Sequence, residues 1–203
     1  MTRTFLQLMT DLRRISAELL PPHSPVARYS DNEVLRILSF RLFAHAEIEG
    51  FVESVAESMV DALSVKNDRN ILRPAVRDQI LYHHMLTQSY PPRTLVNMPT
   101  GQRAQKAIRG VLNAVQDDVG KNNGVSEKDL LKLFLPLGVP IDHFNREWLR
   151  SMNELARARG EVAHNSWNRT TTVQQPTPQG ERQRLVRPLW GLQGLVRSVQ
   201  SSI

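Results

Sequence analysis

The chain has no cysteine among its 203 residues, which excludes disulfide bonds and metal sites built on thiolates. It has no apolar run long enough to cross a bilayer, and its N-terminus lacks the apolar core and cleavage site of a secretory signal. It also contains no glycine-rich phosphate loop, no serine nucleophile elbow and no histidine pair spaced with a carboxylate for metal binding. We therefore expect a cytoplasmic protein that does not associate with a membrane and needs no metal and no cofactor.

Strand patterns are absent as well. No stretch alternates apolar and polar residues for long enough to predict a strand, and no repeat of fixed period is present. Apolar residues instead recur at helical spacing in segments that end at proline or glycine. The sequence predicts an all-α protein, a bundle of five to seven helices in one domain of residues 1–203. The expected helices cover residues 4–20, 30–64, 74–87, 100–120, 126–134, 142–164 and 187–201.

The boundaries of these segments follow from local signals. Residues 1–25 are expected to form an extra N-terminal helix and a proline-rich linker. Ser30 or Asp31 can cap the second helix, and Asp142 can cap the helix that ends near residue 164. Residues 165–183 are polar and contain prolines, so we expect a mobile loop before the closing helix.

The charge of the chain is strongly basic. The formal net charge is +6 and the isoelectric point is about 10.2. The excess is concentrated after residue 156, where Glu161 and Glu181 oppose seven arginines: Arg157, Arg159, Arg169, Arg182, Arg184, Arg187 and Arg197. One interpretation is a polyanionic partner, because arginine holds phosphates in bidentate fashion. The other is a basic surface without a function.

The segment Arg157-Ala-Arg-Gly-Glu-Val-Ala-His164 joins a fixed cation to an imidazole a few residues downstream. These two groups can cut an RNA backbone without metal, since imidazole moves protons and guanidinium stabilises charge on phosphate. The pattern is short, and about two such pairs are expected by chance in a chain this rich in arginine. Arg77 with His83 or His84 fits it too.

A second group of polar residues lies on the expected helix 30–64. Arg41, His45 and Glu49 recur every four residues, beside an apolar stripe that Glu47 borders on its other side. The simpler interpretation is a helix face with solvated ion pairs. The alternative is that this polar ribbon lines a cleft against a second helix.

Two segments together resemble a known family. Phe43-Ala-His-Ala-Glu-Ile-Glu-Gly-Phe51 on an early helix is followed by Leu155-Ala-Arg-Ala-Arg-Gly-Glu-Val-Ala-His-Asn165, a loop and a closing helix. In this the chain resembles the HEPN superfamily, and its RiboL-PSP-HEPN-like branch, from about residue 31 to the C-terminus. The resemblance implies a metal-independent endoribonuclease of a toxin or defence system, which cleaves single-stranded RNA with Arg/His motifs paired across a homodimer.

The resemblance also implies roles for individual residues. Arg159 and His164 are the expected catalytic pair. The supporting or alternative residues are Arg157, Asn165, Glu49, Glu47, His45 and Arg41. The implied products are a 2′,3′-cyclic phosphate and a 5′-hydroxyl, so DNA, which lacks the 2′-hydroxyl, is not a substrate. The implied partners are RNA, a second copy of the chain and an antitoxin or partner defence subunit.

Helix geometry leaves the acting arginine open. On an ideal helix Arg159 and His164 diverge by about 140°, whereas Arg157 and His164 nearly eclipse. Gly160 predicts that the helix loosens, which would let Arg159 and His164 converge, so Arg159 is placed first. The alternative function is a non-catalytic HEPN-like module that binds RNA or a protein, with both arginines contacting phosphates or paired with Glu154 or Glu161.

Overall fold

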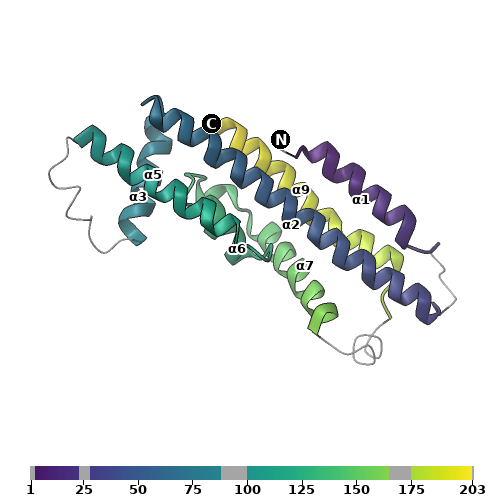
Figure 1. The fold of residues 1–203 in the computed structure, drawn as a ribbon. Coiled ribbons are helices and arrows are strands. Elements are labelled where there is room, and N and C mark those ends of the chain that lie inside the picture. The colour runs from purple at the N-terminus through teal and green to yellow at the C-terminus, as the bar shows by residue number, and fades with distance from the viewer. Residues whose placement is uncertain (1–2, 23–27, 88–99, 165–174, 203) are drawn as a thin grey trace. The chain divides into compact units, whose positions relative to one another are not determined.

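The computed structural model describes residues 3–22, 28–87, 100–164 and 175–202. Within these ranges all regular secondary structure is helical, so the predicted all-α class is confirmed. None of the described helices is long and apolar enough to cross a membrane. The helices are α1 (Phe5–Leu19), α2 (Asp31–Asp68), α3 (Pro74–Thr87), α5 (Thr100–Val119), α6 (Glu127–Phe134), the 3-10 helix η1 (Ile141–His143), α7 (Arg146–His164) and α9 (Pro178–Ser202) (Figure 1).

The first two helices each begin with a capping box, and at α2 the predicted cap Ser30 is confirmed. The Thr4 hydroxyl accepts a hydrogen bond from the Gln7 backbone N–H at 3.2 Å, and the Gln7 side chain accepts one from the Thr4 N–H at 2.8 Å. The Ser30 hydroxyl and the Glu33 carboxylate form the same reciprocal arrangement at the start of α2. Such capping boxes satisfy backbone donors that the first helical turn leaves unpaired.

The end of α2 lies beyond the predicted boundary near residue 64. The helix continues to Asp68 and closes with a Schellman motif, in which Asn70 has a left-handed backbone with φ of 55°. The Ile71 N–H donates to the Lys66 carbonyl at 2.9 Å, and the Asn70 N–H donates to the Asn67 carbonyl at 3.0 Å. Asparagine tolerates this conformation, which explains why the helix ends here.

Two later boundaries also differ from the prediction. Asp142 lies in η1 and does not cap α7; instead the Asn145 side-chain oxygen accepts hydrogen bonds from two backbone N–H groups of the first turn, at 2.8 and 3.2 Å. α9 begins at Pro178, so the last six residues of the predicted loop at 165–183 are helical. Proline favours the first helical position, where its missing N–H costs nothing. Residues 165–174 lie outside the described ranges.

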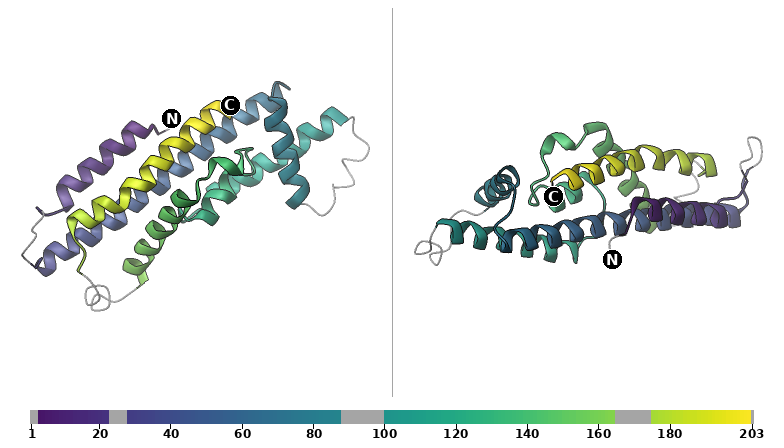
Figure 2. Two further views of the ribbon diagram at one scale, coloured as in Figure 1. Left: turned by 180° about the vertical axis from the view of Figure 1, so that it is seen from behind. Right: turned by 90° about the horizontal axis from the view of Figure 1, so that it is seen from above.

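Contacts divide the chain into two compact units, and α2 and α9 contribute to both. A single domain over residues 1–203 therefore remains a prediction. The first unit comprises residues 1–52, 124–127 and 145–193, and so contains α1, the first part of α2, α7 and most of α9. Here α1 and α7 each run antiparallel to α2, whereas α9 runs parallel to it (Figures 1 and 2). The main buried side chains of this unit are Leu8, Leu12, Val34, Ile37, Phe40, Ala44, Ile48, Phe51, Leu149, Met152, Leu155, Leu185 and Leu192.

One close approach within this unit involves a glycine. The indole of Trp148 on α7 packs directly on Gly191 of α9, where an added Cβ would lie 2.0 Å from the Trp148 Cδ1 atom. The indole N–H also donates to the carbonyl oxygen of Pro188 at 3.1 Å. Only glycine leaves room for this packing, and it fixes α7 against α9.

The second unit comprises residues 53–123, 128–144 and 194–203. It contains the end of α2, α3, α5, most of α6, η1 and the end of α9. Its core is made by Val55, Met59, Leu63, Ile80, Ile108, Leu112, Val115, Leu130, Leu133 and Phe134. α5 is tied to α2 by a reciprocal pair of hydrogen bonds, in which the Asn67 and Gln105 amides each donate to the other residue's carbonyl at 3.1 Å.

Candidate active site

The predicted catalytic residues are carried by the C-terminal half of α7. Leu155 and Ala158 are buried, and they direct one face of the helix into the core of the first unit. α7 remains helical from Arg146 through Gly160 to His164. The expectation that the helix loosens at Gly160 is therefore wrong, because the packing of α7 outweighs the small helix propensity of glycine. The side chain of His164 and the whole of Asn165 lie outside the described part of the chain.

The two candidate arginines have different surroundings. Arg157 is exposed, and its Nη1 atom lies 2.6 Å from Glu161 Oε1 one turn along the helix. This confirms the salt bridge that the alternative function predicts. Arg159 is half-buried and forms no hydrogen bond or ion pair with another described residue. Because the helix is unbroken, the backbone positions of Arg157 and His164 lie about 20° apart around its axis, and those of Arg159 and His164 about 140° apart.

Arg41 of α2 connects the three helices of this region. Its Nε and Nη2 atoms donate to the two carboxylate oxygens of Glu181 on α9, at 3.0 and 2.5 Å. Its Nη1 atom donates to the carbonyl oxygen of Ala158 on α7 at 3.5 Å. The side chains of Arg41 and Glu181 are 9% and 3% exposed. Arg41 is thus a buried, bidentate link to the α7 turn that carries Arg159, and the interpretation as a solvated ion pair is wrong for this residue.

His45 is the second member of the predicted polar ribbon, and it too is buried, with 2% of its surface exposed. Its Nδ1 atom lies 3.7 Å from Glu49 Oε2, one turn further along α2. α2 and α7 run in opposite directions (Figures 1 and 2). Arg41 contacts α7 at Ala158. Residues that follow Arg41 on α2 therefore lie beside earlier residues of α7, whereas His164 lies about 9 Å from Ala158 in the opposite direction along α7. The structure brings Arg41 to the motif but places His45 and Glu49 progressively away from its histidine.

Glu47 faces a different neighbour. Its carboxylate forms a short ion pair with Arg3, whose guanidinium also pairs with Asp11 of α1 at 2.7 Å. Partial burial alone would lower the pKa of Arg3, but the hydrogen bonds and charges of Glu47 and Asp11 outweigh burial and raise it. Glu47 thus joins the N-terminal segment to α2, and the structure does not bring it to the Arg/His motif.

Glu181 was not predicted as a site residue, because it falls in the segment interpreted as a loop. Its carboxylate receives Arg41 and lies 3.5 Å from the Nε atom of Arg184. One signal in the sequence pointed to it. Glu181 is the last acidic residue of the chain, in a region that is otherwise basic, and an isolated acid among arginines is a strong candidate for a structural ion pair.

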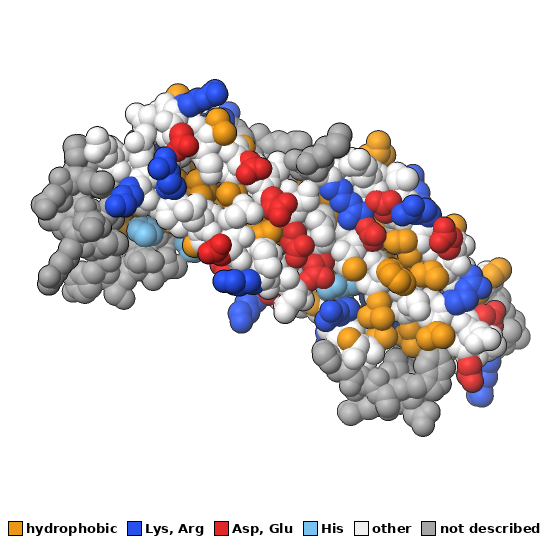
Figure 3. Space-filling view, in the orientation of Figure 1, with side chains coloured by type: hydrophobic (Ala, Val, Ile, Leu, Met, Phe, Trp, Pro, Cys, Tyr) orange, Lys and Arg blue, Asp and Glu red, His pale blue; other side chains and the backbone are white. Residues whose placement is uncertain are grey.

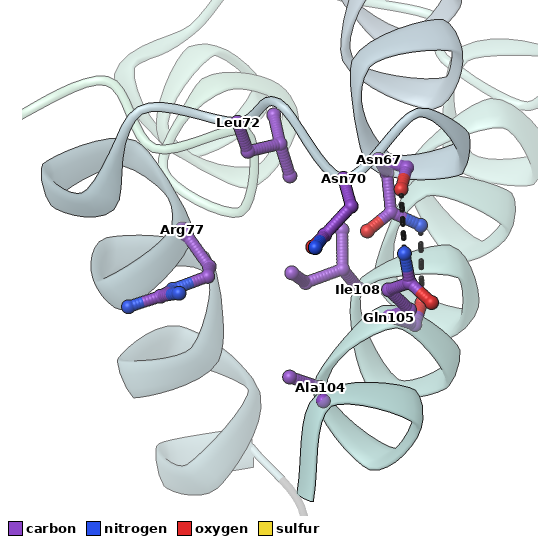
Figure 4. Close-up of a pocket in the computed structure, with 8 residues that line it drawn as sticks. Asn67, Asn70, Leu72, Arg77, Ala104, Gln105 and Ile108 are labelled. Atoms are coloured by element: carbon purple, nitrogen blue, oxygen red, sulfur yellow. Dashed lines mark hydrogen bonds between the residues drawn. The ribbon is translucent and has the colours of Figure 1, made fainter.

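The second unit contains a pocket of about 140 Å³ between the end of α2, α3 and α5. Its lining includes Asn70, Arg77 and the side chains of Asn67 and Gln105, whose amides are occupied by each other's backbone (Figure 4). Arg77 also pairs with Asp78 at 3.1 Å. The pocket shares no residue with the Arg/His motif. Among the described residues no group of three or more histidine and carboxylate side chains is placed to hold a metal ion.

Comparison with known proteins identifies one family. The family model described as RiboL-PSP-HEPN matches residues 10–177, which include α7, Arg41 and the complete Arg157 to His164 segment. Searches of curated proteins and of solved structures found no significant match.

Proposed function

Because the chain belongs to the RiboL-PSP-HEPN family, we propose that it is a metal-independent endoribonuclease of a toxin or defence system, acting on single-stranded RNA. Family membership by itself supports a nuclease-like or RNA-related role. The observation that carries the proposal is the unbroken helix α7, which bears Arg157 and Arg159 and ends at His164. The last two turns of α7 follow directly after Ala158, whose carbonyl oxygen accepts a hydrogen bond from buried Arg41.

The chemistry that this helix can perform is a transesterification. The ribose 2′-oxygen attacks the adjacent phosphorus, and the bond from phosphorus to the 5′-oxygen breaks. An imidazole takes the proton from the 2′-hydroxyl, and an imidazolium gives a proton to the leaving 5′-oxygen. We assign these transfers to His164, with a second copy contributed by a partner chain. A guanidinium stabilises the negative charge that develops on the phosphate oxygens.

Two observations bear on which arginine stabilises the phosphate. Arg157 lies on the same side of the helix axis as His164, but Glu161 neutralises its charge. Arg159 has no carboxylate partner among the described residues, so its full charge is available to an anion. The ion pair of Arg157 is exposed and worth only a few tenths of a kcal/mol, which a phosphate can replace. We keep Arg159 as the first assignment and Arg157 as its rival.

The proposal is tested by incubating purified protein with a labelled single-stranded RNA in the presence of EDTA. We expect cleavage with a 2′,3′-cyclic phosphate end, identified by mass spectrometry, and no cleavage of the matching DNA. His164→Ala should slow cleavage by about 10²- to 10⁴-fold, the usual contribution of a general acid or base. Arg159→Gln and Arg157→Gln then decide between the arginines, since only the acting one should approach that loss.

Two variants serve as controls. His143→Ala removes an exposed histidine of η1, and Arg150→Gln removes an exposed arginine of α7 that precedes the motif. Both should cleave as the wild type does. If the wild-type protein cuts no RNA, with or without the products of neighbouring genes, the nuclease assignment is wrong.

We further propose that the protein acts as a homodimer. α2 exposes three large apolar side chains in the same unit as α7, namely Leu35 at 54%, Leu42 at 36% and Phe43 at 56%. Figure 3 shows apolar side chains gathered over the first half of α2. Phe43→Glu should convert a dimer to a monomer in light scattering, whereas Leu6→Glu, at a 72% exposed position of α1, should not. A monomeric wild type would contradict the paired-motif mechanism.

A role as a toxin or defence nuclease implies that the activity is held silent in the cytoplasm by an antitoxin, a partner subunit or a trigger. Inducing the wild-type chain alone should then arrest growth, and inducing His164→Ala should not. Equal growth in both cultures would remove the toxin assignment.

The alternative function is a helical module that binds RNA or a protein without cleaving. The observation that favours it is the ion pair between Arg157 and Glu161, which it predicts. RNA that is bound but never cut, with affinity lost in Arg157→Gln and Arg159→Gln alike, would support this alternative.

A further inference from the structure

We infer that the exposed face of α9 formed by Gln183, Val186, Arg187 and Trp190, here called the α9 face, is a stacking and phosphate-binding surface for single-stranded RNA. This inference rests on the proposed RNA-directed function. It assigns a place for the nucleotides that flank the cut, separate from the Arg/His motif on α7. The observations that carry it are the exposure of Trp190, the cation beside it and the absence of acidic residues from this part of the chain.

Trp190 is the most exposed of the large hydrophobic side chains described, with 79% of its surface free. A tryptophan is rarely left in water without a partner, because its ring offers a large apolar area. The packing of α9 does not need this ring. The opposite face of the helix supplies the buried contacts, through Leu185 and Leu192 and the ion pair of Glu181. The indole is therefore available to a ligand.

The neighbours of Trp190 favour a nucleic acid over a protein surface. Arg187 is exposed, lies one turn before Trp190 on the same side of α9, and forms no ion pair with another described residue. Val186, at 49% exposure, is the other apolar side chain of the face, so the apolar area is small. A flat π-system next to an unopposed guanidinium is the combination that binds a base and its phosphate.

Charge complementarity extends along the helix. From Arg182 to Ile203 the sequence contains four arginines and no aspartate or glutamate. The acid that directly precedes this stretch in the sequence, Glu181, is buried and already paired with Arg41. In the view from behind, α9 lies in front of α2, and no other described helix covers its first two thirds (Figure 2). From Arg182 onward α9 itself therefore offers a polyanion no repulsive charge.

The position of the α9 face fits substrate that reaches the motif. Glu181 and Ala158 are joined through Arg41, so the beginning of α9 lies beside the motif-bearing half of α7. α9 runs antiparallel to α7, so Trp190, nine residues after Glu181, lies about 14 Å along the helix axis in the direction away from His164. His164 lies about 9 Å the other way from Ala158, so an RNA strand must span more than about 20 Å, or several nucleotides, between the motif and the α9 face. The α9 face would thus hold nucleotides to one side of the scissile bond and lower the dissociation rate of the substrate.

The test uses the His164→Ala protein as the parent, so that the RNA stays intact. Its affinity for a fluorescein-labelled, unstructured 20-nucleotide RNA is measured by anisotropy as a function of salt. Trp190→Ala should weaken binding by about 5- to 160-fold, the range reported by alanine substitution for stacking on one base. Trp190→Phe should recover part of the loss. Arg187→Gln should reduce the slope of log Kd against log salt by about 0.7, because one phosphate contact is removed.

Tyr82→Ala provides a matched aromatic control, since Tyr82 is 64% exposed on α3, outside the α9 face. It should bind RNA as the parent does. Unchanged affinity in Trp190→Ala would overturn the inference and leave the nuclease proposal standing. Loss of self-association in Trp190→Ala, with affinity per protomer unchanged, would also overturn it and assign the face to protein contact. Binding that depends on Trp190 in a protein whose wild type cuts no RNA would support the inference and remove the nuclease proposal.

Discussion

Replacing Arg41 by methionine should destabilise the first unit more than any exposed arginine substitution in the chain. The change leaves the carboxylate of Glu181, 3% exposed, without its two charged hydrogen bonds at 3.0 and 2.5 Å. Removing one partner of a buried ion pair costs about 3–5 kcal/mol, because the other charge stays buried. Arg184 Nε, 3.5 Å from Glu181 Oε2, remains as a weaker counter-charge. We therefore expect a loss near 3 kcal/mol, the lower end of that range.

The measurement is urea unfolding followed by both tryptophan emission and far-UV circular dichroism. Trp148 is buried against α9 and reports on the first unit. Coincidence of the two signals establishes whether one transition describes the whole chain. The matched control is Arg36→Met, on the same helix, where an exposed guanidinium donates to the carbonyl oxygen of Glu18. Its free energy of unfolding should change by less than about 0.5 kcal/mol.

A double-mutant cycle separates the ion pair from the packing of the side chains. Arg41→Met with Glu181→Met should regain most of the loss, since buried ion pairs replaced by apolar side chains of similar volume are often as stable. The reasoning is refuted if Arg41→Met costs less than about 1 kcal/mol at an unchanged m value, or if the losses of the two single variants simply add.

Other substitutions test local features of the fold. Gly191→Ala forces a methyl group to within 2.0 Å of the buried Trp148 ring and should cost about 1–3 kcal/mol in urea unfolding, whereas Gly194→Ala, with nothing within 4 Å, should be neutral or stabilising; equal effects would contradict the packing. Ser30→Ala should cost about 0.5–2 kcal/mol by removing the cap of α2. Hydrogen bonds from the Ser30 backbone and hydroxyl lower the pKa of Glu33, so its stabilising contribution is present above the unfolded pKa and is lost as pH falls through the lower folded value. Unfolding at pH 7 and at about pH 2 should show a deficit of Glu33→Gln at the higher pH alone, and a deficit that does not depend on pH would rule out this account.

The sequence predicts helices well where their boundaries depend on neighbouring residues. The start of α2 follows from a capping side chain three residues from its partner, and the prediction of Ser30 as the cap is confirmed. Prediction from sequence fails where a contact between residues far apart in the chain determines whether a segment is helical. Residues 178–183 are polar and contain proline and glycine, which is typical of a loop, yet they form the first turns of α9. Glu181 in those turns is held by Arg41, 140 residues earlier in the chain.

At the candidate site, too, local features could be predicted from the sequence and features that depend on tertiary packing could not. The helix that carries the Arg/His motif could be recognised from its amphipathicity, and the HEPN family is confirmed. The role of the motif stays a prediction. The roles of the polar ribbon could not be recognised in this way. Periodicity places Arg41, His45 and Glu49 on one side of α2, but it contains no information about which helix packs there. The antiparallel packing of α7 sets Arg41 beside the motif, while the other two residues continue away from it.

The guanidinium of Arg41 holds α7 and α9 at once, and these helices are consecutive in the described chain, on either side of residues 165–174. The Ala158 carbonyl before these residues and the Glu181 carboxylate after them are therefore both held by the Arg41 side chain. Insertions between such fixed ends cost little, about 0.6 kcal/mol for each doubling of length. In evolutionary terms, descendants of this chain can change the length of the sequence between these helices without having to rebuild the helices that support the motif.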